Sequence, residues 1–157
     1  MDRIFHFIKS NLKMIIIALI ISFFLMEFIA WSAHKYLMHG VLWKVHKDHH
    51  QPTKNWFQKN DFFFIIFAVP SWLCIMLGMM YGYPFSVGFG FGIALYGLIY
   101  FIIHDVLIHR RFKWFVKTKN RYFIAVRKAH KAHHKNRFKE EGESFGMLIV
   151  PRKYFKK

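Results

Sequence analysis

Cysteine is almost absent from this 157-residue sequence, because Cys74 is the only one and it lies inside a long apolar run. A single cysteine excludes a disulfide framework within the chain and a Cys-x-x-Cys redox pair. A motif for NAD or flavin is also missing. The glycine pattern GFGFG at 88–92 lies within an apolar run and has no strand before it. It therefore predicts close packing of helices rather than a nucleotide-binding loop.

Charge is missing from three 20-residue stretches, 14–33, 62–81 and 84–103, apart from Glu27 in the first. About 20 apolar residues in a helix cross a bilayer core of roughly 30 Å. The first stretch is longer than the apolar region of a signal peptide, and no clean small-x-small cleavage site follows it. The sequence therefore predicts an all-α integral membrane protein, a single domain over residues 1–157, with three transmembrane helices.

The polar segments between these spans are strongly basic. The sequence YGYP at 81–84 predicts a tight turn between the second and third spans, so segments 34–61 and 104–157 must emerge on one side. These segments carry 5 and 16 Lys and Arg residues, against 3 in the first 13 residues. Basic segments stay in the cytoplasm, so we predict that both form a cytoplasmic, histidine-rich helical cap. The basic N-terminus would then lie on the opposite side, against the same rule.

Negative charge is scarce throughout: 8 Asp and Glu residues face 24 Lys and Arg residues, for a formal net charge of +16. A basic tail with many aromatic residues can indicate nucleic acid. Attraction to the anionic leaflet of a membrane explains the lysines more simply. We therefore predict contact with membrane lipid and no nucleic-acid partner.

The tail also contains a predicted amphipathic helix over residues 112–126, FKWFVKTKNRYFIAV. One stripe of this helix would be apolar: Phe112, Phe115, Val116, Tyr122, Phe123 and Val126. The other side would carry Lys113, Lys117 and Arg121. The pattern predicts a helix at the membrane interface, and packing over the histidine-rich segments is the alternative.

Ten of the eleven histidines follow a repeated pattern, and only His6 lies outside it. Each copy is an H-x4-H box followed by an H-x2-H-H cluster, and each box begins where a predicted span ends. The first copy comprises His34, His39, His46, His49 and His50. The second copy comprises His104, His109, His130, His133 and His134.

This spacing suits metal binding if the helices carry local irregularities. Helical positions i, i+3 and i+4 share a face, so each H-x2-H-H cluster should point three imidazoles one way. A five-residue step rotates by about 140° in a regular helix, so an H-x4-H box needs a distortion to converge on one ion. Gly40, directly after His39, offers a helix end. For His104 and His109 we predict a π-bulge; alternatively, the two members of each box bind different ions.

Ten imidazoles exceed what one ion can take, so the sequence predicts two ions, and imidazole suits iron, zinc, copper and nickel. Asp48 and Asp105 each adjoin a cluster histidine and can orient imidazoles, or be exposed loop acids. Glu27 precedes His34 by two helical turns, and we expect this intramembrane carboxylate to be a polar partner of the site. A metal transporter would instead place its ligands near mid-membrane.

These motifs resemble the membrane fatty acid hydroxylase superfamily. Within it, HKYLMHGVLWKVHKDHH, HDVLIHRRF, RKAHKAHH and SFGMLIVP are similar to the bacterial β-carotene 3-hydroxylases, in order, from about Glu27 to Pro151. The resemblance implies that the ten pattern histidines ligate a non-haem di-iron centre, with zinc as a substitute and no catalytic residue beyond the ligands. The even number of spans usual in that family leaves a fourth helix open.

The resemblance also implies a reaction. It implies O₂-dependent hydroxylation at C3 of a β-ionone ring, from β-carotene to β-cryptoxanthin and then zeaxanthin, in the bacterial inner membrane. Because the chain lacks an NAD or flavin motif, electrons would come from a reduced ferredoxin, which a basic face would steer. A fatty-acid or sterol hydroxylase or desaturase of the same superfamily is the alternative.

Overall fold

The computed structural model describes residues 2–51, 57–115, 117–140 and 142–156, and all regular structure in these ranges is helical. This confirms the predicted all-α class. The α-helices are α1 (Asp2–Ser32), α2 (Trp43–His50), α3 (Phe63–Tyr81), α4 (Pro84–Phe101) and α5 (Arg121–Lys135). Two π-helical segments, Ala33–Val41 and Ile102–Ile108, and two 3-10 helices, Lys59–Phe62 and Arg152–Phe155, complete the set.

Three of the described helical runs are long and apolar enough to cross a membrane: Asp2–Val41, Lys59–Tyr81 and Pro84–Ile108. Each of them contains one of the spans predicted from the sequence. The chain is therefore an integral membrane protein with three candidate spans in the described residues. The side on which its polar segments emerge stays a prediction.

The chain forms two compact units. The first contains the residues up to Met26 together with Phe63–Leu98, and the second contains Glu27–Phe62 together with the chain from Ile99 onward. All ten pattern histidines belong to the second unit. The prediction of a single domain stays a prediction.

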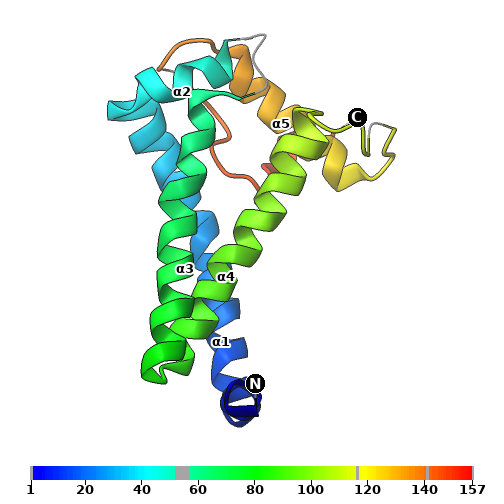
Figure 1. Ribbon diagram of the computed structural model, residues 1–157. Helices are drawn as coiled ribbons and strands as arrows, with labels where there is room; N and C mark the ends of the chain where they lie inside the picture. The colour runs from blue at the N-terminus through cyan, green and yellow to red at the C-terminus, as the bar shows by residue number, and fades with distance from the viewer. Residues whose placement is uncertain (1, 52–56, 116, 141, 157) are drawn as a thin grey trace. The chain divides into compact units, whose positions relative to one another are not determined.

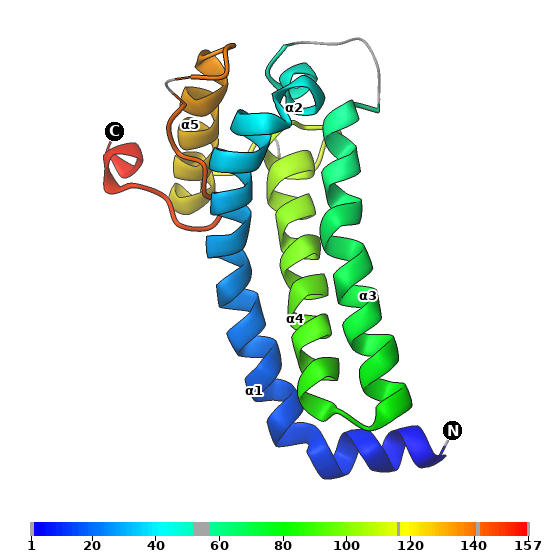
Figure 2. The same ribbon diagram turned by 90° about the vertical axis from the view of Figure 1, so that its left-hand side faces the viewer.

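Glycines of α4 let the helices of the first unit pack closely. In this unit α3 and α4 lie side by side with α1 (Figures 1 and 2). A Cβ atom added at Gly88 would clash with the Ile15 carbonyl oxygen, and one added at Gly92 would clash with Ser22 Oγ. Only glycine allows the two backbones to come this close. The prediction that GFGFG packs helices is therefore confirmed.

The first turns of α1 run at an angle to the rest of the helix (Figure 2). In this part, Ser10 Oγ donates to the carbonyl oxygens of His6 and Phe7, at 2.8 and 3.1 Å, and Asn11 Nδ2 donates to Phe7 O at 2.9 Å. Side-chain bonds back to the preceding turn often bend helices. The basic residues of the N-terminus thus lie on a part of α1 that differs in direction from the apolar run.

The predicted helix over 112–126 is wrong in its first half. Helix α5 begins at Arg121, after Asn120, whose Oδ1 accepts hydrogen bonds from Tyr122 N at 2.9 Å and from Phe123 N at 3.3 Å. Asparagine is among the preferred residues at this capping position. Phe115 has a φ of +54°, which is incompatible with a right-handed helix. Val116 lies outside the described residues.

The second half of that stretch packs inside the second unit. Val126 is buried in an apolar cluster with Ile103, Leu107 and Met147, and Tyr122 and Phe123 pack against this cluster. By contrast, the Trp114 side chain in the preceding loop is 63% exposed. Packing next to the histidine-bearing segments therefore holds for the residues of α5, and contact of the loop with the membrane interface stays a prediction.

Candidate metal centre

The second H-x4-H box lies in a π-helical turn. A π-helix forms hydrogen bonds between residues five apart, and His109 N donates to His104 O at 2.9 Å. This geometry brings the two imidazoles together, with ring centroids 4.5 Å apart. The predicted π-bulge is therefore confirmed.

The first box lies in the segment Ala33–Val41, which is π-helical up to a kink at Gly40, so the predicted helix interruption directly after His39 is confirmed. The backbone is kinked at Gly40, and the imidazole centroids of His34 and His39 lie 5.3 Å apart. Gly40 has a φ of −103° and a ψ of −118°, which are non-helical but not left-handed. The irregularity expected at this box is therefore present, as a π-helical turn with a kink at Gly40.

Five imidazoles converge at one place, and we call them the five-histidine group. Each offers one ring nitrogen, and these five atoms lie within 4.8 Å of one another. Their side chains are all buried. The Nε2 of His46 lies 3.2 Å from that of His34 and 3.1 Å from that of His50. The members are His34, His39, His46, His50 and His133.

Four other imidazoles form a second convergence, the four-histidine group, which comprises His49, His109, His130 and His134. The Nε2 atoms of His109 and His130 lie 3.1 Å apart. His104 adjoins this group, because its Nε2 lies 2.9 Å from that of His49. Within the described residues, His134 Nε2 is buried without a hydrogen-bond partner.

The structure divides each H-x2-H-H cluster between the two groups, contrary to the expectation that its three imidazoles point one way. In α2, His46 and His50 belong to the five-histidine group and His49 to the other. In α5 the division is reversed: His130 and His134 belong to the four-histidine group, and His133 to the other. Positions i and i+4 stay together, whereas the intervening residue is about 100° away from its neighbour around the helix.

Both members of the first box belong to the same group, so the structure gives the two imidazoles a place to share one ion, and their actual ligation stays a prediction. In the second box, His109 belongs to the four-histidine group, and His104 lies next to His49 of that group. The two boxes therefore serve different groups, one each.

The Nδ1 atom of each member of the five-histidine group faces an oxygen that can only accept a hydrogen bond. The pairs are His34 with Phe145 O (3.0 Å), His39 with Lys139 O (3.0 Å), His50 with Asn136 O (3.0 Å), His133 with Glu143 O (2.9 Å) and His46 with Asn60 Oδ1 (2.6 Å). Nδ1 must then carry the proton and donate, which leaves Nε2 with a free lone pair. Five lone pairs so close together repel one another unless a cation lies between them.

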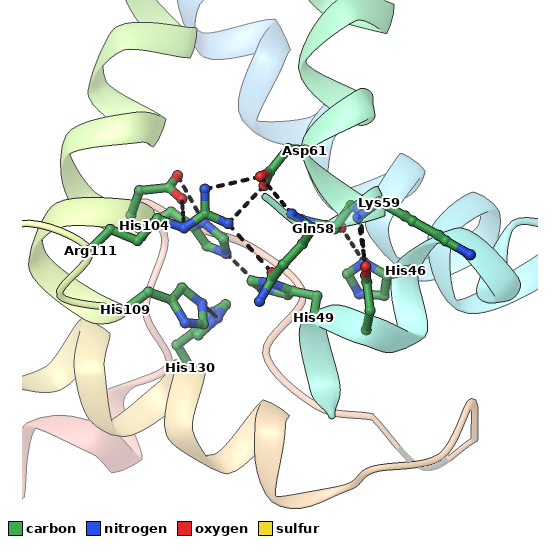
Figure 3. A network of polar contacts seen from close by, with 12 residues as sticks. His46, His49, Gln58, Lys59, Asp61, His104, His109, Arg111 and His130 are labelled. Atoms are coloured by element: carbon green, nitrogen blue, oxygen red, sulfur yellow. Dashed lines mark hydrogen bonds and ion pairs between the residues drawn. The ribbon is translucent and has the colours of Figure 1, made fainter. Parts of the chain in front are cut away.

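A polar network orients the imidazoles at the other group (Figure 3). His49 Nδ1 donates to Gln58 Oε1 at 3.0 Å, and His104 Nδ1 donates to Asp105 Oδ2 at 3.2 Å. Arg111 links these partners, because its guanidinium lies 3.1 Å from Asp105 Oδ1 and 3.5 Å from Gln58 Oε1. Asp105 therefore lies beside an imidazole, as the sequence predicted.

Arg111 also binds Asp61, with contacts of 2.8 and 3.1 Å between the guanidinium nitrogens and the two carboxylate oxygens (Figure 3). Asp61 Oδ2 in turn accepts a hydrogen bond from Gln58 N at 3.0 Å. The residues of segment 58–61 and Arg111 were not found from the sequence. Their types carry no metal signal, since amide and guanidinium groups occur on most polar surfaces.

Asp48 and Glu27 both bind backbone amides of neighbouring segments. Asp48 accepts from Lys59 N at 2.6 Å and Asn60 N at 3.4 Å, and Asn60 accepts from His46. Asp48 thus contacts the residue that accepts from His46, and its role in orienting imidazoles stays a prediction. Glu27 is buried and binds the backbone of residues 147–149.

Burial keeps these imidazoles neutral at physiological pH. Removal from water, reinforced by repulsion from neighbouring histidines, lowers the pKa of His50 to about 4 and the pKa values of His109 and His133 to about 3. Removal from water also lowers the pKa of His46 to about 2, and it depresses those of His49 and His130 strongly. Neutral imidazole is the form that binds metal.

The nitrogen separations indicate the kind of ion that fits. Two nitrogens bound at about 2.1 Å lie about 3.0 Å apart at right angles and about 3.4 Å apart in a tetrahedron. The Nε2–Nε2 distances of 2.9 to 3.2 Å between neighbouring imidazoles, and the limit of 4.8 Å within each group, are short enough for the nitrogens to share one ion. Each group can therefore hold a metal ion, and all-imidazole donors suit iron, zinc, copper or nickel.

Comparison with known proteins gives consistent matches. The model of the family described as fatty acid hydroxylase matches residues 19–151. A beta-carotene hydroxylase of Pantoea ananas is 42% identical over 126 residues, 80% of this chain and 71% of the relative. A beta-carotene hydroxylase of a Paracoccus species is 36% identical, over 80% of this chain and 78% of the relative. The chloroplastic beta-carotene 3-hydroxylase 2 of Arabidopsis thaliana is 36% identical, over 81% of this chain and 42% of the relative. No solved structure matches the chain.

Proposed function

Because the chain belongs to the fatty acid hydroxylase family, we propose that it is a di-iron β-carotene 3-hydroxylase. It converts β-carotene to β-cryptoxanthin and then to zeaxanthin, in an O₂-dependent reaction. The observation that carries the proposal is the pair of converging imidazole groups inside the segment that matches the family. The names of the relatives supply the substrate.

In this proposal each histidine group holds one iron. His34, His39, His46, His50 and His133 bind the first iron, and His49, His104, His109, His130 and His134 bind the second. When bound, the pair of irons supplies reductive activation of O₂, so that one oxygen atom enters a C–H bond and the other leaves as water. Zinc can replace iron in either group, and such a substituted protein would be inactive.

The chain itself orients the imidazoles and keeps water away from their nitrogens. The Nδ1 hydrogen bonds fix the ring orientation of the histidines, which raises the basicity of the facing Nε2 atoms. Within the five-histidine group no side chain is more than 7% exposed, so bulk water does not reach these nitrogens. Exclusion of water protects an oxidising site from side reactions.

Hydroxylation proceeds in two separate steps. The two rings of β-carotene are equivalent, and the described part of the chain offers one pair of histidine groups. The first product must therefore leave, or turn end for end, before its second ring can react. A singly hydroxylated intermediate follows from this geometry.

Electrons come from a small acidic protein such as a ferredoxin. The chain carries a formal net charge of +16, and segment 104–157 alone holds 16 of its Lys and Arg residues. Charge of this sign attracts an acidic donor and places both basic segments on the cytoplasmic side of a bacterial inner membrane. A metal transporter is disfavoured, because hydrogen bonds to fixed acceptors hold the imidazoles in place.

The test is pigment analysis in cells that make β-carotene and also express this chain with a ferredoxin system. We expect β-cryptoxanthin first and zeaxanthin later, with more of the intermediate when oxygen is limiting. The His133→Ala variant should leave β-carotene unchanged, whereas His6→Ala should behave as the wild type. Hydroxylated fatty acids or altered sterols, with carotene untouched, would overturn the substrate and favour the alternative within the same family.

A further inference from the structure

The described residues between Asn136 and Phe145 form a segment that lies against the five-histidine group. Its main-chain carbonyl oxygens accept the Nδ1 hydrogen bonds of His34, His39, His50 and His133, at 2.9 to 3.0 Å. Four of the five imidazoles of this group are therefore oriented by one stretch of backbone.

The Phe145 side chain adds a second contact to the same group. Its ring packs edge-on against His34, His39 and His133, with centroids 5.4, 5.1 and 5.2 Å away. If this stretch moved, the imidazoles would lose both their hydrogen-bond acceptors and their packing.

The next residues of this stretch are tied to α1 by Glu27. Its Oε1 atom accepts hydrogen bonds from Met147 N, Leu148 N and Ile149 N, at 3.1, 2.9 and 3.0 Å. The Glu27 side chain is 7% exposed. A carboxylate that accepts several backbone hydrogen bonds away from water holds that backbone strongly.

Space around this contact is limited. A Cβ atom added at Gly146 would lie 3.1 Å from Glu27 Oε1 and 3.8 Å from Trp31 Cδ1. The side chain that would sit closest to the carboxylate is thus absent, so the three amides can approach one oxygen atom.

We propose that Glu27 is a positioning residue for the five-histidine group: it anchors residues 147–149, and the anchored backbone orients four imidazoles of that group. The inference rests on the proposed metal centre and deepens it. Glu27 acts through the backbone, two steps away from the metal.

The effect should be selective, because the other group has different supports. His49 and His104 are oriented by Gln58 and Asp105, which belong to the Arg111 network. None of these partners lies in the stretch 136–149. Loss of the Glu27 anchor should therefore loosen one metal position and leave the other in place.

The experiment uses the full chain in detergent, reconstituted with ⁵⁷Fe and studied by iron analysis and Mössbauer spectroscopy. His133→Ala and His109→Ala serve as references for loss of the iron in the five-histidine and the four-histidine group. Glu27→Leu removes the acceptor oxygen, Glu27→Gln keeps an amide oxygen in its place, and Asp2→Asn is a control at an exposed carboxylate of the first unit.

We expect Glu27→Leu to bind the first iron about 10- to 100-fold more weakly, with a spectrum like that of His133→Ala. Hydrogen exchange at the amides of residues 147–149 should accelerate in the same variant. Glu27→Gln should restore much of the binding and of the protection, and Asp2→Asn should match the wild type. Gly146→Ala, which pushes against the carboxylate from the other side, should shift the same spectral component if Glu27→Leu does not fold.

Equal loss of both irons in Glu27→Leu, or a wild-type spectrum together with faster exchange, would overturn the positioning role. A wild-type protein that does not bind one iron in each group would overturn the proposed metal centre instead. A wild-type protein with both irons but no action on carotene would overturn the substrate and leave this inference standing.

Discussion

His46 and His49 lie one helical turn apart on α2, with ring centroids 5.5 Å apart, yet they belong to different histidine groups. Helix α2 therefore contributes imidazoles to both histidine groups.

This division predicts that substitutions on one helix remove different metals. His46→Ala should remove the iron of the five-histidine group and His49→Ala that of the other, and each should abolish hydroxylation. Iron analysis and the two Mössbauer components, measured on each variant, would show which iron is lost. If both variants lost the same component, the assignment of α2 to two groups would be wrong.

Substitution of Arg111 should weaken the four-histidine group from outside. Arg111→Gln leaves Asp61 and Asp105 without their shared cation, so we expect a loss of about 1 to 3 kcal/mol in unfolding free energy and a drop of about 10- to 100-fold in metal affinity or activity. Chemical denaturation and metal titration measure these two effects. Arg152→Gln, at an exposed position, is the matched control; equal behaviour of the two variants would contradict the role of the network.

Acid should destabilise the metal-free protein. Histidines in the unfolded chain take up protons below about pH 6.5, whereas in the folded chain the pKa of His50 is lowered to about 4 and those of His109 and His133 to about 3. The unfolded state therefore binds more protons between these limits, and stability is lost as the pH falls through this window. Melting of chelator-treated protein at several pH values tests this; an unchanged melting temperature from neutral pH down to about pH 4 would rule it out.

The close approach of α1 and α4 within the first unit predicts opposite effects at two glycines. Gly92→Ala would force a methyl group against Ser22, and we expect it to destabilise the protein by about 1 to 3 kcal/mol. Gly97 has no atom within 4 Å of an added Cβ, so Gly97→Ala should be neutral or stabilise the helix by up to about 1 kcal/mol. The unfolding free energies of the two variants in detergent test this prediction. Similar losses of stability in both would argue against the close contact of α1 and α4.

The sequence predicted those structural elements that are marked by the types and the spacing of their side chains. The apolar runs identified the three spans, and the spacing of His104 and His109 predicted a π turn because a regular helix would separate them. The predicted helix over 112–126 began too early, because the apolar periodicity was given more weight than Asn120. Asn120 is the N-cap after which α5 begins at Arg121.

The partners of the imidazoles were largely beyond sequence reasoning. Four of the acceptors at the five-histidine group are backbone carbonyls, which every residue has. Their role depends on where the chain returns after α5, and no residue type marks that path. Asp105 was found because it is adjacent in sequence to His104, whereas Gln58 and Asn60 are brought close only by the fold.

The two π turns have a consequence for how such a centre can arise. A π turn is an α-helix with one residue too many, so a single inserted codon in an ordinary membrane helix is enough to create it. The insertion rotates everything downstream by about 100°, and here the chain soon leaves the helix, after Val41 and after Ile108, so that the rotation need not propagate through a packed span. Deleting one residue from either box would reverse the change and turn its second histidine away from the first. The ends of membrane helices are thus places where a metal-binding pair can be gained or lost in one genetic step, while the spans themselves keep their packing.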